Sequence, residues 1–468
     1  MNRVHKVSLP VFLVALALAG TSVGSVPETE YWQRAINEAS QNGGGRVVIP
    51  AGRHLVGELD MRSNVELHLA KGAVLEGLPG LENYRIVTLP FSEGTWSAVI
   101  AAYGVTNVAI TGEGEVFGNG KDWNPPKGAR DRIGCTEGVR ARGVLFADSV
   151  GIRLEDFTLR DAACWGVVFK RCVGVTARRV KIDSCVNINN DGFDIEAKDV
   201  LIEDCDVNSG DDAYCIKSND PEFTVENVIV RRCVARTHCS ALKVGTASHG
   251  VIRNVRFEKC NVKTPRRVYR DMAPMPKDLS GVGLDIPGVP RYLTGAGQVA
   301  IFVDCVDGGV VENVNYDGIT FEGCKTPIFI RGGMRMKRAC GIPPSKKRIL
   351  RNITIRNVSG RAEHGRPSTI TGVEGCRPQN VSLEGVDVEC RVEVEDDRPF
   401  GVPGPEYAGR YPDSVMFNDI RLPAYGLFVD QVDGIRLVDV QFRLPAGVRD
   451  ARAPIFGVKK SDRNDKRL

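Results

Sequence analysis

Hydrophobic and polar residues alternate over short stretches along most of the chain, and the stretches are separated by glycine, asparagine or aspartate. Such a pattern predicts strands over 45–50, 65–69 and 108–112. Further strands share a Gly, Asn or Asp at their first position: Gly151, Gly174, Asp199, Asn227, Asn254, Asn352 and Gly434. The first five of these starts lie 23, 25, 28 and 27 residues apart. One alternating strand per copy, at a period of roughly 20 to 30 residues and without intervening helices, predicts a parallel β-helix.

One stretch near the N-terminus has helical periodicity instead. Over 30–39, Trp32, Ala35, Ile36 and Ala39 fall on one helical face. A repeat stack needs its open end covered, so we expect this helix to cap the β-helix. The repeats then continue without a break in composition, which predicts one all-β domain over 25–468.

The first 24 residues have the layout of a secretory signal. Arg3, His5 and Lys6 precede an apolar run over 7–20, which ends in small residues. An uncleaved anchor at a membrane surface is the alternative, but the run is short for a bilayer span. We therefore expect a secreted or periplasmic protein with no membrane contact beyond export. Of the 62 basic residues, Arg3 and Lys6 would be removed, leaving 60 against 58 acidic ones. This balance favours neither nucleic acid nor membrane as a partner.

The chain has 14 cysteines. Six of them sit at related repeat positions: Cys172, Cys205, Cys233, Cys260, Cys305 and Cys324. We expect these thiols to stack along the axis as part of the core, although pairing in an exported protein stays open. No spacing resembles a zinc site, and we expect neither a metal nor another cofactor.

Carboxylates recur one repeat apart in the middle of the chain. Asp191 precedes Asp211 by 20 residues and Asp212 by 21, close to one coil. Neighbouring coils of a β-helix lie about 4.8 Å apart, so the three side chains should gather on one face. Mutual repulsion should raise at least one pKa, which suits an inverting glycosidase that needs one protonated acid and one charged base. The alternative is that these aspartates only close turns, which fits Asp191-Gly192 better than the pair Asp211-Asp212.

These motifs resemble glycoside hydrolase family 28, the polygalacturonase-like enzymes, over nearly all of the mature chain. Asn189-Asn190-Asp191-Gly192 and Gly210-Asp211-Asp212 are similar to the family's Asn-Thr-Asp and Gly-Asp-Asp motifs. Weaker likenesses lie at 43–52, 63–69, 118–120, Trp165 and 422–427, the last resembling bacterial members. The resemblance implies a right-handed parallel β-helix and hydrolysis with inversion. It implies Asp211 as the general acid, Asp191 and Asp212 as the groups that activate water, and Asn189 as a substrate contact.

The likeness weakens where the family carries Gly-His-Gly. Aligning Leu242 to Thr246 with the family pattern puts Ser240 in the histidine position, with His238 two residues earlier. Residues two apart on a strand point to the same face, so His238 could still serve the site, or Ser240 could replace the histidine. A solvated loop histidine is the alternative.

A second departure lies at the family's Arg-Ile-Lys motif, which binds the uronate carboxylate. Here Phe302 and Asp304 occupy the two cationic positions, so a uronate there would lose two charge-assisted contacts and meet a like charge. Lys243 and Arg331 could supply cations from other coils and restore the anion site, or could be solvated strand-edge charges.

Two interruptions of the repeat, near 263–297 and 331–349, are rich in Lys and Arg and should build the walls of the cleft. They favour an anionic polysaccharide as the partner of an expected monomer, although they could simply keep the rim soluble. Nucleic acid is disfavoured because aromatic residues do not alternate with these charges. The sequence thus predicts an inverting hydrolase of a pectin-like or other acidic polysaccharide. A polysaccharide lyase and a non-catalytic glycan-binding β-helix stay open as alternatives.

Overall fold

The computed structural model describes residues 28–92, 96–122, 140–187, 189–266, 297–338, 343–363, 365–392, 398–412, 416–417 and 419–464. The predicted leader and most of the predicted loop at 263–297 lie outside these residues. Cys135 and Cys340 lie outside them too. None of the helices in the described part of the chain has the length and apolar character needed to cross a bilayer.

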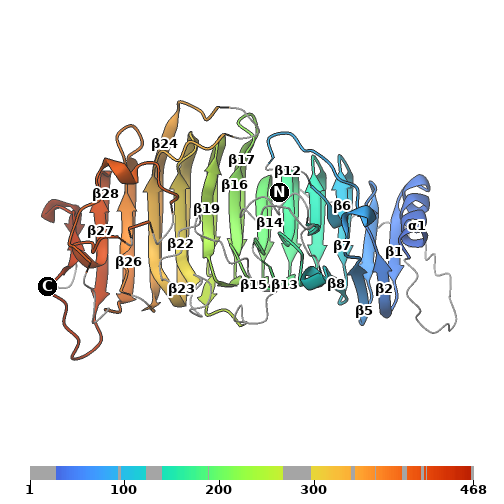
Figure 1. Ribbon diagram of the computed structural model, residues 1–468, viewed down its shortest axis with the longest axis horizontal. Helices are drawn as coiled ribbons and strands as arrows, with labels where there is room; N and C mark the ends of the chain where they lie inside the picture. Colours follow the sequence, from blue (N-terminus) through green and yellow to red (C-terminus); the bar gives the residue numbers. More distant parts are fainter. Residues whose placement is uncertain are drawn as a thin grey trace, which may run out of the picture.

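The strands form three parallel sheets that wind around one elongated core, each strand pairing with its counterpart on the next coil (Figure 1). Sheet 1 holds β1 (Gly45–Ile49), β4 (Val65–Leu69), β7 (Thr106–Thr111), β10 (Val150–Glu155), β17 (Thr224–Arg231), β20 (Val251–Glu258) and β30 (Arg463–Asn464). Sheet 2 holds β2 (Gly52–Val56), β5 (Ala73–Gly77), β8 (Glu115–Phe117), β11 (Thr158–Arg160), β13 (Lys181–Ser184), β15 (Asp206–Ser209), β18 (Val234–Thr237) and β21 (Asn261–Lys263).

Sheet 3 holds β3 (Leu59–Asp60), β6 (Ala98–Tyr103), β9 (Arg142–Ala147), β16 (Tyr214–Ser218), β19 (Ser240–Ser248), β22 (Gly297–Cys305), β25 (Ser368–Thr371), β27 (Ala424–Asp430) and β29 (Ala453–Phe456). Longer strands turn corners between sheets: β12 (Val167–Arg178), β14 (Phe193–Glu203), β23 (Gly309–Gly332), β24 (Arg348–Ala362), β26 (Pro378–Glu389) and β28 (Asp433–Arg443). Short 3-10 turns lie at Leu81–Asn83, Gly120–Asp122, Pro405–Tyr407 and Lys460–Asp462. The predicted right-handed parallel β-helix is therefore confirmed.

The Gly, Asn and Asp residues that open each predicted repeat lie at the corner where the chain enters sheet 1. Asn227, Asn254, Asn313 and Asn352 all have φ near +57°, a backbone region that asparagine tolerates better than most residues do. Their side-chain amides also bond from coil to coil, as Asn254 Nδ2 donates to Asn227 and Asn313 Nδ2 to Asn254. The left-handed corner explains why the sequence repeat begins with these residue types.

The helix α1 (Thr29–Gln41) covers the N-terminal end of the stack, as predicted (Figure 1). Trp32 and Ile36 are buried against the first coil, and Ala35 and Ala39 pack beside them. Its apolar face therefore covers the end of the core that no further coil would cover.

The predicted thiol stack holds for three of its six members. Cys205, Cys233 and Cys260 lie at the corner between sheets 1 and 2, and their thiols donate to Ala177 O, Ile202 O and Val230 O on the preceding coils at 3.8, 3.7 and 3.5 Å. Cys172, Cys305 and Cys324 lie on other parts of the coil. Cys205, Cys233 and Cys260 each come six residues after the residue that opens their repeat, whereas Cys172 comes two residues before Gly174. All twelve described cysteines are free thiols.

Candidate active site

The predicted acidic residues lie on successive turns from sheet 2 into sheet 3. Asp191 is in the turn from β13 to β14, and Asp211 and Asp212 are in the turn from β15 to β16. Backbone bonds join the two turns, since Asp211 N–H donates to Asn190 O at 3.1 Å and Gly192 N–H to Asp212 O at 2.8 Å. The three carboxylates are therefore on adjacent coils and close together, as the spacing predicted.

Asn190 anchors the turn that carries Asp191, a role the sequence did not reveal. This fully buried amide donates to Ala162 O at 2.8 Å and Cys164 O at 2.9 Å, and its oxygen accepts from the backbone N–H of Val186. The neighbouring Asn189, predicted as a substrate contact, is half-buried and accepts a bond from Arg140 at 2.9 Å. Asn190 thus fixes the backbone, while Asn189 lies on the surface of the turn.

Asp211 has the surroundings of a proton donor. Its carbonyl oxygen accepts bonds from the hydroxyls of Ser209 and Thr237, and its Oδ1 accepts one from Asp212 N–H at 2.9 Å. Burial raises the pKa of Asp211, and the charge on Asp212 raises it further. Its side chain is still partly exposed, so a ligand can reach it.

Asp212 has the opposite character, although it is the next residue. Lys243 Nζ lies 2.6 Å from its Oδ2, and Ser240 N–H donates to its Oδ1 at 3.2 Å. Burial would raise the pKa of Asp212, but Lys243 and then Lys217 outweigh it and hold the pKa below its usual value. Two adjacent carboxyl groups therefore favour different protonation states, which is the arrangement that acid–base catalysis requires.

Lys217 and Asp194 belong to the cluster and were missed. Lys217 Nζ lies 2.5 Å from Asp194 Oδ1, 3.3 Å from Asp191 Oδ2 and 4.3 Å from the centre of the Trp165 ring. Burial raises the pKa of both carboxyl groups. The charge on Asp194 raises that of Asp191 further, the charges on Asp212 and Asp211 raise that of Asp194, and Lys217 opposes the rise in both. Asp194 lies on β14 and Lys217 on β16, the strands that follow the two acidic motifs. The signal available in the sequence was a lysine on β16, a strand whose other residues are mostly apolar.

The structure corrects the argument about His238. This residue lies in a bend between β18 and β19 rather than on the strand of Ser240, so the rule for residues two apart does not apply. Its side chain is only 1% exposed, which also removes the solvated-loop alternative. Ser240 holds Asp212 through its backbone, and Lys243 holds the same carboxylate through its ammonium group. Lys243 is therefore paired with Asp212 and is not a solvated charge at the edge of a strand.

Cys239 also lies beside the acidic pair. One ligand atom from each of Asp211, Asp212 and Cys239 comes within 4.8 Å of the others. Such a set could hold a cation. Its two carboxyl groups, however, are those of Asp211 and Asp212, which favour different protonation states. The thiol also helps to hold the pKa of Asp212 down.

Three residues predicted as substrate contacts, Phe302, Asp304 and Arg331, are buried in the structure. Phe302 is 2% exposed and stacks on Phe329, with ring centres 5.2 Å apart. The apolar cluster around these two rings includes Tyr407, Met416, Phe417 and Leu422. Asp304 is fully buried, and burial raises its pKa well above the usual range. The Arg331 guanidinium donates to Thr371 Oγ1 and Tyr407 O, both at 3.1 Å. A chain segment distant in sequence covers this part of sheet 3, and no local pattern indicated that.

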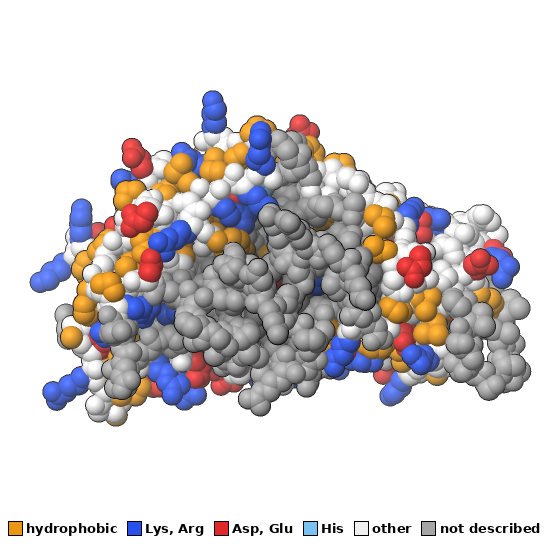
Figure 2. Space-filling model, in the orientation of Figure 1, with side chains coloured by type: hydrophobic (Ala, Val, Ile, Leu, Met, Phe, Trp, Pro, Cys, Tyr) orange, Lys and Arg blue, Asp and Glu red, His pale blue; other side chains and the backbone are white. Residues whose placement is uncertain are grey.

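Only some of the basic residues in the stretch at 331–349 are exposed at the surface. Arg331 is buried, and Arg335 forms an ion pair with the buried Asp307. Lys346 and Lys347 are exposed, as predicted. On the face in Figure 2, basic and acidic side chains are both spread along the described surface.

The sequence of the chain is similar to those of one known family. The chain matches the model of the glycosyl hydrolases family 28 over residues 40–270 and 302–396. A probable polygalacturonase of Vitis vinifera is 24% identical over 378 residues, covering 76% of this chain and 69% of that protein.

Two solved structures are similar in fold. The family 28 exopolygalacturonase of Yersinia enterocolitica has a TM-score of 0.66 at 17% identity, covering 94% of this chain and 75% of that one. The polygalacturonase of Erwinia carotovora subsp. carotovora has a TM-score of 0.59 at 19% identity, covering 79% and 92%. At these identities the likeness to the two structures concerns the fold.

Proposed function

The chain belongs to glycosyl hydrolases family 28, and from this premise we propose that it is an exported, inverting glycoside hydrolase of a pectin-like or other acidic polysaccharide. The observation that carries the proposal is the split between neighbouring carboxyl groups. Asp211 holds its proton to higher pH, while Lys243 keeps Asp212 charged. An inverting reaction needs one group of each kind.

In the proposed reaction, Asp211 donates its proton to the glycosidic oxygen as the bond from that oxygen to the anomeric carbon breaks. A water molecule attacks the anomeric carbon from the opposite side of the sugar and releases its proton to Asp212. Asp191 accepts a hydrogen bond from this water and orients it. Lys217, in contact with Asp191 and Asp194, positions Asp191.

The proposed acidic substrate is supported by the relatives, one of which is a probable polygalacturonase. The chain departs from the family at the uronate-binding positions, since Phe302 and Asp304 replace two cations and are buried. We therefore propose that the sugar beside the scissile bond is held differently from galacturonate in the family pattern. Pectic, rhamnogalacturonan and sulfated glycans make up the substrate panel for testing this.

The test compares Asp211→Asn with wild type on that panel. Loss of a general acid should lower kcat by about 10²- to 10⁴-fold, while the exposed Asp433→Asn, a matched change far from the cluster, should leave kcat unchanged. Proton NMR of fresh product should show inverted anomeric configuration. Retention, unsaturated products, or full turnover in Asp211→Asn would refute the mechanism. If wild type binds glycan but cleaves none of the panel, the protein is a binding module instead.

A further inference from the structure

Trp165 lies beside the acidic cluster, and the reaction proposed above gives its ring no role. The residue is in the turn between β11 and β12, on the coil that precedes the coil of Asp191. A backbone bond joins the two turns, since Gly166 N–H donates to Asp191 O at 2.9 Å. Trp165 is only 5% exposed, so its ring offers little surface to a sugar. The indole therefore supports the cluster from within the protein.

The group that Trp165 supports is the ammonium group of Lys217. Lys217 Nζ lies over the face of the indole, 4.3 Å from its centre, and also 2.5 Å from Asp194 Oδ1 and 3.3 Å from Asp191 Oδ2. The face of an aromatic ring carries partial negative charge and attracts a cation. An ammonium group has three hydrogens to donate, and here three groups attract it. The contact with Asp191 is the longer of the two contacts with carboxylates.

The indole of Trp165 is itself held by a second cation and a second indole. The guanidinium carbon of Arg142 lies 4.9 Å from the centre of the Trp165 ring and 3.8 Å from the centre of the Trp96 ring. The two indoles meet edge to face, with centres 5.3 Å apart. Both belong to a buried apolar cluster with Leu145 and Val168. Dense packing of this kind allows the Trp165 ring little movement, so the ring is a fixed support for Lys217.

The position of Lys217 decides which oxygen of Asp191 is available to water. Lys217 Nζ donates to Asp191 Oδ2. The other oxygen, Oδ1, is buried and accepts no hydrogen bond from the part of the chain that the structure describes. A carboxylate held by one oxygen presents the other in a fixed direction, which is what orienting a water molecule requires.

We propose that Trp165 is a positioning residue, whose ring fixes the ammonium group of Lys217 between Asp191 and Asp194 and thereby orients Asp191 towards the attacking water. The role of Asp191 rests on the proposed function, whereas the hold of Trp165 on Lys217 does not. Without the ring, the ammonium group has two partners and shifts towards the nearer one, Asp194. Asp191 then loses its orientation, which slows the chemical step without weakening the binding of substrate.

The first experiment measures the contact by a double-mutant cycle in chemical denaturation, with Trp165→Leu, Lys217→Met and both together. A cation–π contact is worth a factor of about 3 to 30 in an equilibrium constant. Trp165→Leu should therefore change the unfolding equilibrium less, by about that factor, once Lys217 is methionine. Phe169→Leu is the matched control, because Phe169 is fully buried on β12 and stacks on Phe146 in the core. Its effect should be the same in both backgrounds, and additive effects of Trp165→Leu and Lys217→Met would overturn the proposal.

The second experiment measures kcat and KM on the glycan that wild type cleaves best. Trp165→Leu should lower kcat by about 3- to 30-fold at unchanged KM, and Phe169→Leu should change neither. Trp165→Phe keeps an aromatic face that attracts cations less strongly, so its kcat should lie between those of wild type and Trp165→Leu. It carries both tests if the leucine variant does not fold. An unchanged kcat, or a rise in KM alone, would overturn the positioning role. If wild type cleaves no glycan, the proposed function fails, and the cycle alone decides whether Trp165 fixes Lys217.

Discussion

Replacing Lys217 by methionine tests whether its ammonium group compensates the charges buried beneath the proposed active site. Lys217 contacts Asp191 and Asp194, whose side chains are only 4% and 3% exposed, and is itself 16% exposed. Methionine keeps most of the length and removes the charge. Removing one partner of a buried ion pair costs about 3–5 kcal/mol, because it leaves an uncompensated buried charge. We expect the free energy of unfolding near neutral pH to fall by about that amount.

The loss should depend on pH in a defined direction. The folded-state pKa values of Asp191 and Asp194 are raised by burial and by neighbouring carboxylates, and Lys217 opposes that rise. A raised pKa means that stability is fully present below the unfolded value, about 3.9 for aspartate, and is lost as pH rises through the folded value. Without Lys217 the folded values rise further. The deficit of Lys217→Met should therefore be small near that unfolded value and grow towards neutral pH.

The assay is chemical denaturation followed by circular dichroism at an acidic and a neutral pH. Lys181→Met, an exposed lysine on β13, is the matched control. Adding Asp194→Asn to Lys217→Met should recover part of the loss at neutral pH, since one of the two charges is then gone. A deficit of the same size at both pH values, or one no larger than that of the control, would refute the reasoning.

Three further predictions concern the site. The dependence of kcat/KM on pH should be bell-shaped, falling at high pH as Asp211 loses the proton it donates and at low pH as Asp212 gains one; a profile without the alkaline limb would argue against Asp211 as the acid. Prolonged dialysis against EDTA should leave glycan turnover unchanged, because the proposed steps use carboxyl groups alone; loss of turnover that calcium restores would favour a lyase. Cys239 is the one described cysteine that is not fully buried, so Cys239→Ser should remove one rapidly reacting thiol from a maleimide titration of the native protein, and an unchanged count would contradict its exposure.

Much of the fold could be predicted because its determinants are local and repeat. Asn227, Asn254 and Asn352 mark corners that need a left-handed backbone, and the alternating residues after them mark strands with one face in the core. The prediction for the six cysteines was less successful, because only three of them come at the same position after the corner residue that opens their repeat. Cys205, Cys233 and Cys260 meet that condition.

Within the site, the sequence predicted which carboxyl groups lie close together, but it did not predict which of them carries a proton. The one-coil spacing brought Asp191, Asp211 and Asp212 together, because neighbouring strands of a β-helix pair directly. Which of these carboxyl groups carries a proton depends on Lys217 and Lys243, whose ammonium groups reach the cluster from β16 and β19. Coulombic interactions inside a protein depend on distance and burial, which spacing along the chain does not specify.

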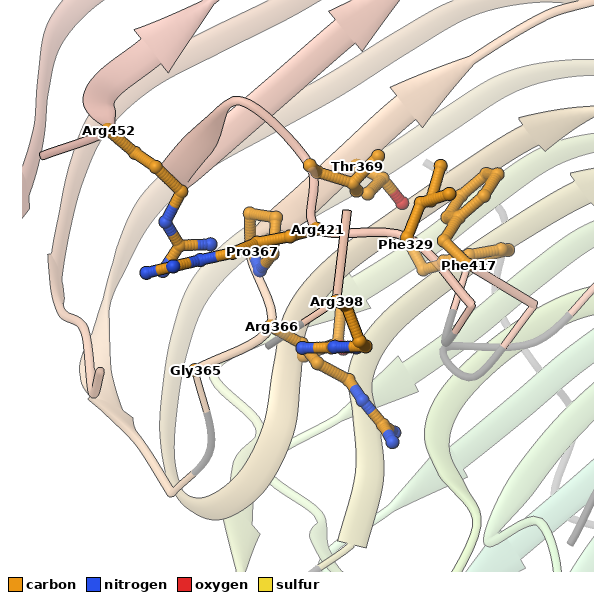
Figure 3. Close-up of a pocket in the computed structure, with 12 residues that line it drawn as sticks. Phe329, Gly365, Arg366, Pro367, Thr369, Arg398, Phe417, Arg421 and Arg452 are labelled. Carbon is orange, nitrogen blue, oxygen red and sulfur yellow. The ribbon is translucent and has the colours of Figure 1, made fainter. Parts of the chain in front are cut away.

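The sequence alone was enough to determine a parallel β-helix, its capping helix and the clustering of three aspartates, since each depends on residues one coil apart or less. The tertiary structure decided which side chains a ligand can reach. Tyr407, Met416, Phe417 and Leu422 pack against Phe302 and Phe329. Arg366, Arg398, Arg421 and Arg452 line one pocket from distant parts of the chain (Figure 3). Burial and convergence of this kind arise from long-range packing, and the repeat pattern carries no record of it.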